Sequence, residues 1–168
     1  MADKFLKIGS NGFQTEQEFA TTSAGAADAG KGIGLNGAGK IDETLLPSGI
    51  GADAATLTAG ENLAAGDFVY VTGTGTVMKA DATALAKAAV GYVNAAVTSG
   101  QPATVFFDDT NSNQTGLTAG TKYFLSDTVP GKVSATPPTT AGRIVQYLGI
   151  ATSTTDIHVS IQQPIVRA

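Results

Sequence analysis

The feature that most constrains the fold is a duplication in the C-terminal two-thirds of the chain. Residues 63–71 (LAAGDFVYV) are echoed by residues 117–125 (LTAGTKYFL), and in each copy a glycine follows a leucine by three positions. The residues after that glycine are mostly apolar, and a glycine turn that leads into such a run is typical of a β-strand. The sequence therefore predicts two similar units of β-structure.

Further segments repeat in the same order in both units. They form three pairs: 75–80 with 131–136, 89–93 with 147–151, and 103–107 with 157–161. Each half therefore contains about four predicted strands, which are too few to bury an apolar face without a partner sheet. We expect an all-β fold in which two similar four-stranded halves pack or close on each other as a small β-barrel or β-sandwich, over residues 53–163.

Two equivalent segments between the predicted strands are expected to be crossing loops. Residues 80–89 (ADATALAKAA) have the composition of a short helix. The equivalent residues 136–143 contain Pro137 and Pro138, which the interior of a helix does not tolerate. Because the halves are duplicates, we predict a loop in both.

Composition supports a folded β-protein and excludes several classes of partner. Hydrophobic residues make up 42% of the chain and no apolar run approaches the length of a membrane span, about 18 residues. The net charge is −4, with basic residues scattered from Lys4 to Arg167, so neither nucleic acid nor membrane is expected as a partner. The absence of cysteine excludes disulfides and thiolate metal sites. No secretion signal is evident at the start, which indicates a protein made and kept in the cytoplasm.

The first fifty residues lack the duplicated pattern and predict an extended arm. A weak repeat relates residues 6–16 to residues 33–43, and in each copy a strand pair is expected to turn at glycine, around residues 11–12 and 37–39. The small residues 21–30 (TTSAGAADAG) are predicted to be a linker between the two copies.

The predicted domain organisation is an N-terminal arm, residues 1–50, followed by a β-barrel-like head, residues 51–168. Residues 47–51 (PSGIG) separate the two. Neither copy of the weak repeat is large enough to bury its apolar side chains, so we expect a partner polypeptide to cover them. These candidate contact residues are Phe5, Leu6, Ile8, Phe13, Phe19, Ile33, Leu35, Ile41, Leu45 and Leu46.

Two loop motifs have partial matches to ligand-binding patterns. Residues 34–40 (GLNGAGK) have the glycine spacing of a phosphate-binding loop, but Ile41 stands where Ser or Thr holds magnesium, which favours a hairpin turn. Residues 109–113 (DTNSN) begin like a calcium loop, yet Gln114 replaces the turn glycine and Gly120 stands where a carboxylate closes the site. A polar connecting loop explains this segment, and a bound cation stays an open alternative.

No arrangement of side chains predicts catalysis. His158 is the only histidine, and its position in an alternating strand points it away from the core. Glu16 with Glu18, and Asp108 with Asp109, are carboxylate pairs, but nothing around them indicates a cleft, so a solvated face explains them better. We therefore predict no enzyme activity, no catalytic residue, no metal and no cofactor.

Four further segments indicate a family: 23–31 (SAGAADAGK), 39–53 (GKIDETLLPSGIGAD), 117–126 (LTAGTKYFLS) and 136–152 (TPPTTAGRIVQYLGIAT). They resemble segments of tailed-bacteriophage virion proteins, namely capsid decoration (cement) proteins, head fibres and some tail-fibre modules. The resemblance implies homotrimers standing on the capsid, with the N-terminal region on the shell or a neighbouring subunit and a β-rich head facing outward. It also implies synthesis in a bacterial host cytoplasm and a final location on the capsid surface of the virion.

The main functional expectation is a structural virion protein that decorates and stabilises the phage capsid. It is expected to bind the major capsid protein and to form an oligomer, a trimer by the resemblance. The alternative is a short tail-fibre or adhesin module that binds host-surface glycan, although the chain lacks a long shaft and a variable tip. A phage polysaccharide hydrolase is a third interpretation, which requires a cleft with paired carboxylates.

Overall fold

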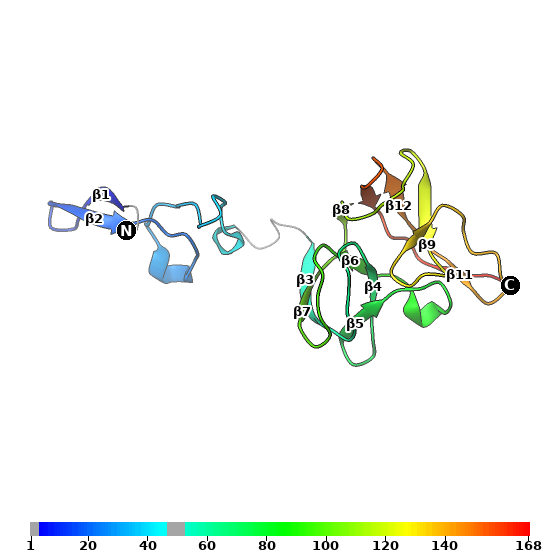
Figure 1. The fold of residues 1–168 in the computed structure, drawn as a ribbon. Coiled ribbons are helices and arrows are strands. Elements are labelled where there is room, and N and C mark those ends of the chain that lie inside the picture. The colour runs from blue at the N-terminus through cyan, green and yellow to red at the C-terminus, as the bar shows by residue number, and fades with distance from the viewer. Residues whose placement is uncertain (1–3, 47–52) are drawn as a thin grey trace. The chain divides into compact units, whose positions relative to one another are not determined.

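The computed structural model describes residues 4–46 and 53–168, and the chain divides between Gly51 and Ala52 into two compact units. Within the described residues, the helical elements are three short 3-10 turns: η1 (Gly25–Asp28), η2 (Glu43–Leu45) and η3 (Leu85–Lys87). All other regular elements are strands (Figure 1). The all-β prediction is confirmed.

The arm begins with a β-hairpin. Strands β1 (Lys4–Ile8) and β2 (Gln14–Glu18) pair antiparallel over five residue pairs, from Lys4 with Glu18 to Ile8 with Gln14. The Asn11 side chain closes the turn, because its Oδ1 accepts a hydrogen bond of 3.1 Å from the Phe13 amide. A strand pair that turns around Asn11 and Gly12 is therefore confirmed.

The second copy of the weak repeat keeps the turn but not the strands. Asn36 Oδ1 accepts hydrogen bonds from the amides of Ala38 and Lys40, at 3.0 and 3.1 Å, so the segment that matches a phosphate-binding loop is an asparagine-closed turn. Before the turn, Ile33 forms only an isolated bridge with Ala20, and after it the chain enters η2. The expected second strand pair is wrong, because the chain leaves the turn for a 3-10 turn instead of returning alongside Ile33.

The predicted linker also has a defined local structure. Residues 21–30 include η1 (Gly25–Asp28), and Lys31 Nζ lies 2.6 Å from Asp28 Oδ1. The Ser23 amide donates a hydrogen bond of 2.8 Å to Thr44 Oγ1, which ties this segment to the end of the arm. The segment that connects the two copies of the weak repeat therefore contains a 3-10 turn.

The first half of the head is a closed five-stranded barrel. Its strands are β3 (Ala54–Ala59), β4 (Phe68–Val71), β5 (Thr76–Lys79), β6 (Gly91–Val93) and β7 (Pro102–Phe106), in the order β3-β5-β4-β6-β7. Strand β3 pairs antiparallel with β7 and parallel with β5, and these two pairings close the barrel. Its interior is filled by small and medium apolar side chains: Ala59, Leu63, Val69, Val77, Val93, Ala103 and Val105.

The second half has the same strand order but stays open. Its strands are β8 (Asp109–Asn111), β9 (Lys122–Leu125), β10 (Val133–Ser134), β12 (Tyr147–Ala151) and β13 (Ile157–Val159), in the order β10-β9-β12-β13-β8. This order repeats β5-β4-β6-β7-β3. A separate pair, β11 (Ile144–Val145) with β14 (Ile165–Val166), completes the head. The duplication seen in the sequence is therefore a duplication of topology.

Each half has five strands, one more than the four expected. The additional strands are β3 and β8, which precede the glycine turn of each half. Because β3 has six residues it reaches both β7 and β5, so the first half closes by itself. Strand β8 has three residues and pairs only with β13. The sequence predicted that the two halves pack or close on each other, and it did not predict that the first half closes on itself.

Equivalent glycines mark equivalent points of the two halves. Gly66 and Gly120 have φ angles of 82° and 79°, the left-handed region that the predicted glycine turns require. Gly91 lies where a Cβ atom would be 2.5 Å from the Phe106 carbonyl oxygen, and Gly149 meets the neighbouring strand even more closely. The backbone geometry therefore requires glycine at two positions in each half.

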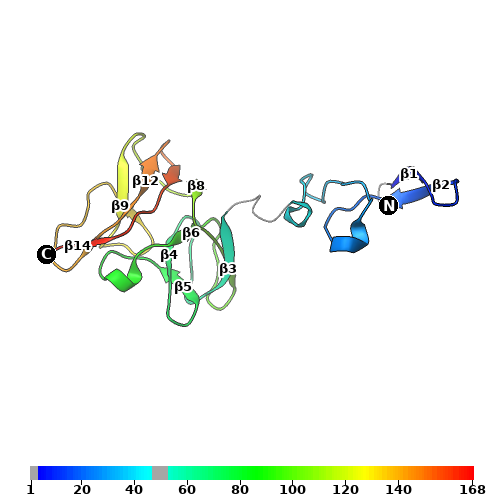
Figure 2. The same cartoon turned by 180° about the vertical axis from the view of Figure 1, so that it is seen from behind.

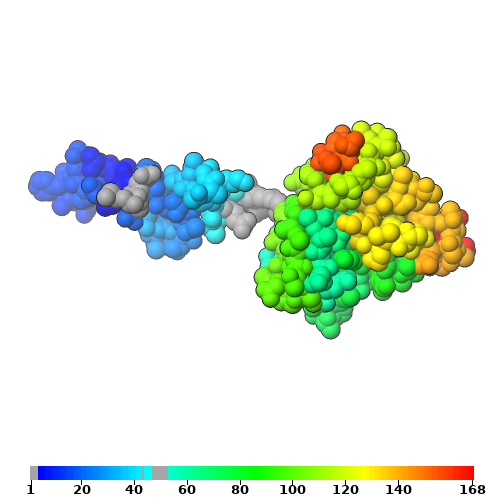
Figure 3. Space-filling model, viewed as in Figure 1, coloured from blue at the N-terminus to red at the C-terminus, as the bar shows by residue number. Residues whose placement is uncertain are grey.

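A shared apolar core joins the halves, which lie side by side in both views of the ribbon (Figures 1 and 2). Phe68 and Tyr92 of the first half pack in one cluster with Leu125, Leu148 and Ile157 of the second. In the space-filling view the yellow surface of the second half lies directly against the green surface of the first (Figure 3). The described part of the head therefore forms one compact unit.

Candidate functional site

The candidate contact residues of the arm are largely exposed. Phe5 and Leu45 are half-buried, and the other eight are exposed: Leu6, Ile8, Phe13, Phe19, Ile33, Leu35, Ile41 and Leu46. Ile8 and Phe13 are 71% and 72% exposed. Among the arm side chains that the structure describes, only Ala20 is buried. The arm therefore has almost no apolar core of its own.

One small aromatic contact orders the arm locally. The rings of Phe5 and Phe19 lie 4.9 Å apart, and Phe19 packs so closely on Gly32 that a Cβ atom there would be 2.9 Å from the ring. On the other face of the hairpin, Leu6 and Ile8 alternate away from Phe5 and stay exposed. A two-stranded hairpin is marginally stable in water, so this apolar face is a candidate contact surface.

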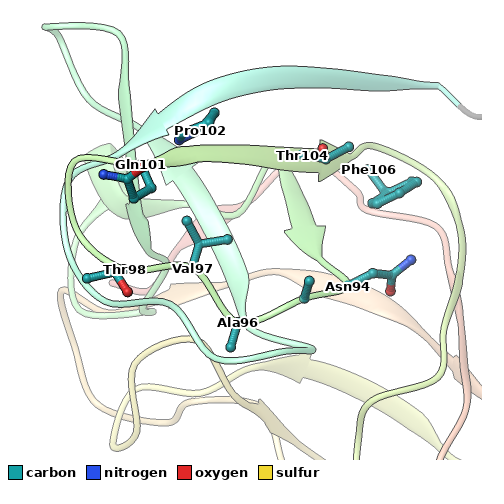
Figure 4. Close-up of a pocket in the computed structure, with 9 residues that line it drawn as sticks. Asn94, Ala96, Val97, Thr98, Gln101, Pro102, Thr104 and Phe106 are labelled. Carbon is teal, nitrogen blue, oxygen red and sulfur yellow. The ribbon is translucent and has the colours of Figure 1, made fainter.

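A groove on the first half of the head is the second candidate site. Its volume is about 660 Å³, and it is lined by Asn94, Ala95, Ala96, Val97, Thr98, Gln101, Pro102, Thr104 and Phe106. Figure 4 shows Pro102, Thr104 and Phe106 along β7, with Val97 and Thr98 of the preceding loop opposite them. This volume falls within the usual range of small-ligand sites, about 300–1,000 Å³.

Strand alternation and a long loop build this groove. In β7, Ala103 and Val105 point into the barrel, so Thr104 and Phe106 lie on its outer face. The loop from residue 94 to residue 101 is bound back to the barrel, because Leu63 and Val97 exchange two backbone hydrogen bonds of 2.8 and 2.9 Å. Phe106 is fixed from behind by Tyr92, whose ring stacks on it at 5.7 Å.

The groove was not predicted from the sequence. The signal that would have indicated it is a difference between the duplicates, since residues 94–101 link β6 to β7 while only residues 152–156 link β12 to β13. The longer link in the first half supplies one wall of the groove. A comparison of connection lengths between the halves therefore identifies it.

Tyr92, the residue behind Phe106, has a strongly shifted pKa. Burial, together with the smaller effects of the Asp109 and Asp108 carboxylates, raises the pKa of Tyr92 to about 12. Elsewhere in the head, burial acts to raise the pKa of Asp81, but hydrogen bonds from Thr83 and Lys87 outweigh it and hold that pKa below its ordinary value.

The calcium-like segment is used inside the fold. Residues 109–111 form β8 instead of the predicted loop, and the buried Asn111 donates from Nδ2 to the Gly66 carbonyl at 3.0 Å. Asn111 Oδ1 accepts a hydrogen bond of 3.2 Å from the Asn113 amide. Within residues 4–46 and 53–168, no group of three or more His, Cys, Asp or Glu side chains is placed to hold a metal ion.

The remaining titratable candidates lie on exposed strand faces. His158 is exposed on β13 between the buried Ile157 and Val159, as its alternation predicted. Glu16 and Glu18 are exposed on β2, and Lys4 Nζ lies 3.0 Å from Glu16 Oε2. His158, Glu16 and Glu18 do not line the groove.

Comparison with known proteins leaves the function to be argued from this geometry. No protein-family model matches the chain, and no curated protein matches it. In the part of the chain that the structure covers, no helix has the length and apolar character to cross a membrane.

Proposed function

We propose that the chain is a structural virion protein that decorates and stabilises a phage capsid. It binds the major capsid protein through its arm and forms a homo-oligomer, a trimer by the resemblance of its sequence to decoration proteins. The head faces away from the shell, and the role requires neither catalysis nor a cofactor.

The observation that carries this proposal is the contrast between the two units. The head has two apolar clusters of its own, whereas the described arm buries only Ala20 and exposes Leu6, Ile8 and Phe13. Burying a large apolar side chain contributes about 1.5–3 kcal/mol before ordering costs. A few such side chains on each arm, multiplied by several arms in one oligomer, are sufficient for firm attachment.

The experiment is a sedimentation assay with expanded, DNA-free heads. Deleting residues 2–19 removes β1 and β2, and it is expected to abolish binding while the head stays folded. Binding that survives the deletion refutes the role of the arm.

A pair of matched double variants tests the apolar side chains themselves. Leu6→Thr with Ile8→Thr keeps strand-forming residues in β1 but removes the exposed apolar face, and is expected to weaken binding at least about tenfold. The control, Val129→Thr with Ile165→Thr, changes two side chains of the head that are 53% and 70% exposed. Equal losses in both double variants would contradict an arm-specific contact.

The second candidate function is a short tail-fibre or adhesin module that binds host-surface glycan. The feature that favours it is the groove beside β7, which no role of the arm explains. The copy number on the virion separates the candidates, because a decoration protein is present in hundreds of copies and a tail fibre in a few tens at most.

A further inference from the structure

We propose that the groove between β7 and the loop of residues 94–101 binds a neutral saccharide. This inference rests on one part of the second candidate function, namely that the head recognises a ligand. It does not depend on the arm. Four properties of the groove support it: a fixed shape, unpaired polar side chains, an aromatic wall and the absence of charge.

The shape of the groove is set before any ligand binds. Besides the pairing of Leu63 with Val97, the Gly100 amide donates a hydrogen bond of 2.7 Å to the Ala59 carbonyl. The Ser99 amide donates a hydrogen bond of 2.9 Å to Asn62 Oδ1. A loop held at several points loses little further conformational freedom on binding, which favours affinity for a weakly interacting ligand.

The polar side chains of the groove are available to a ligand. Among the residues that the structure describes, the side chains of Thr98, Gln101 and Thr104 make no hydrogen bond within the protein, although all three line the groove. Amide and hydroxyl groups both donate and accept. Each sugar hydroxyl has the same dual character, so these side chains match a saccharide.

Phe106 supplies an apolar wall at the end of β7. Tyr92 stacks on it with an interplanar angle of 27°, so the ring is held in one orientation while it lines the groove. The apolar face of a pyranose ring, formed by C–H groups, fits against such a fixed aromatic surface. Pro102 extends the apolar wall along the same strand.

Charge excludes an anionic ligand. None of the nine lining residues is charged, so no side chain compensates a phosphate or a carboxylate, and no lining carboxylate selects a cation. Asp108 and Asp109 act on the neighbouring Tyr92, and they disfavour an anion at the Phe106 end. The ligand class is therefore a neutral saccharide, not a uronic or sialic acid.

An extended peptide fits the groove less well. Strand β6 pairs with β7 only at Val105 and Phe106, which leaves Pro102 to Thr104 without a strand neighbour on that side. A peptide that added a strand there would find a short edge that begins with a proline, which has no amide hydrogen to donate. The edge therefore offers too few backbone partners for strand addition.

The duplicated half provides an internal control. Tyr92 pairs with Phe106, and the equivalent Ile150 pairs with His158, so an exposed histidine stands in the second half where the aromatic wall stands in the first. Substituting Thr104→Trp fills the groove from an exposed strand position. The matched control, His158→Trp, places the same side chain on the outer face of β13, away from the groove.

The test is a titration of the full chain with a panel of neutral oligosaccharides of hexoses, deoxyhexoses and N-acetylhexosamines, followed by saturation-transfer NMR and calorimetry. Wild type and His158→Trp are expected to bind at least one member, and Thr104→Trp is expected to lose detectable binding. Gln101→Ala is expected to weaken binding about two- to tenfold, the loss of one neutral hydrogen bond.

Three results overturn the proposal. They are no binding by any neutral oligosaccharide at millimolar concentration, binding that Thr104→Trp leaves intact, and binding of an extended peptide in the groove instead. Deleting residues 2–19 separates this inference from the capsid role, because it is expected to abolish attachment to heads and to leave saccharide binding unchanged.

Discussion

The buried side chain of Gln146 links the two halves of the head through the backbone of Ala89, and replacing it with alanine is expected to destabilise the head strongly. Gln146 is 2% exposed. Its Nε2 donates to the carbonyl oxygens of Ala89 and Gln162 at 2.9 and 3.1 Å, and its Oε1 accepts from the Ala89 amide at 2.8 Å. The substitution removes all three hydrogen bonds at once.

The magnitude follows from which partners can reach water. Ala89 is 3% exposed, so its amide and its carbonyl would both be left buried without a partner, whereas Gln162 is exposed and its carbonyl can be hydrated. A buried unsatisfied group costs about 1–3 kcal/mol, and two such groups give a loss of about 3–5 kcal/mol. For a domain of this size, that loss lowers the melting temperature by roughly 10–20 °C.

The assay is urea unfolding of the full chain, followed by circular dichroism and tyrosine fluorescence. Gln162→Ala is the matched control, because its side chain is exposed and only its backbone contacts Gln146. This control is expected to change the free energy of unfolding by less than about 0.5 kcal/mol. A Gln146→Ala variant within about 1 kcal/mol of wild type would refute the reasoning that this side chain joins the halves.

Three further changes in the head have defined outcomes. Gly149→Ala is expected to lower the free energy of unfolding by at least about 2 kcal/mol, because a Cβ atom there meets the backbone of the neighbouring strand. A wild-type midpoint in urea unfolding would show that the two strands can move apart at little cost. Asp67→Asn is expected to cost about 2–4 kcal/mol, since Asp67 is 1% exposed and lies 2.6 Å from Lys132 Nζ; an unchanged unfolding curve would show that the ion pair is not needed. The depressed pKa of Asp81 contributes stability above its unfolded pKa, about 3.9, that is lost as pH falls through the lower folded pKa. Melting curves between pH 7 and pH 2 should therefore show a smaller acid loss for Asp81→Asn than for wild type, and equal losses would contradict this role.

Much of the head was predictable because the glycine turns and the apolar runs of the first half recur in the second half. The turns at Gly66 and Gly120 have the expected left-handed geometry, and the alternation of Ile157, His158 and Val159 gives the expected burial. These signals are local, so one sequence suffices to read them.

Two of the strands that were missed, β3 and β8, have weak local signals. Strand β3 is built from Ala, Thr and one Leu, and β8 is Asp-Thr-Asn, a composition typical of turns. Both strands are defined by their partners: β3 pairs with β7 and β5, and β8 pairs with β13. Closure of the first half could not be predicted, because it depends on this long-range pairing.

Of the two candidate sites, the apolar face of the arm was predictable from the sequence and the groove was not. The exposed apolar residues of the arm, such as Ile8 and Phe13, were identified from the sequence because no local core is available to them. The groove depends on Thr104 and Phe106 facing a loop that is bound back to Leu63, and only the folded barrel brings these residues together. The capsid as partner remains a prediction from both the resemblance and the exposed arm.

The most direct test of the central claim is amide hydrogen exchange on residues 4–18, compared between the free chain and the chain bound to expanded heads. The expected result is rapid exchange of these amides in the free chain and strong protection in the particle, with little change in the head. Equal exchange in both states, or strong protection already present in an isolated monomer, would show that another polypeptide does not cover the arm.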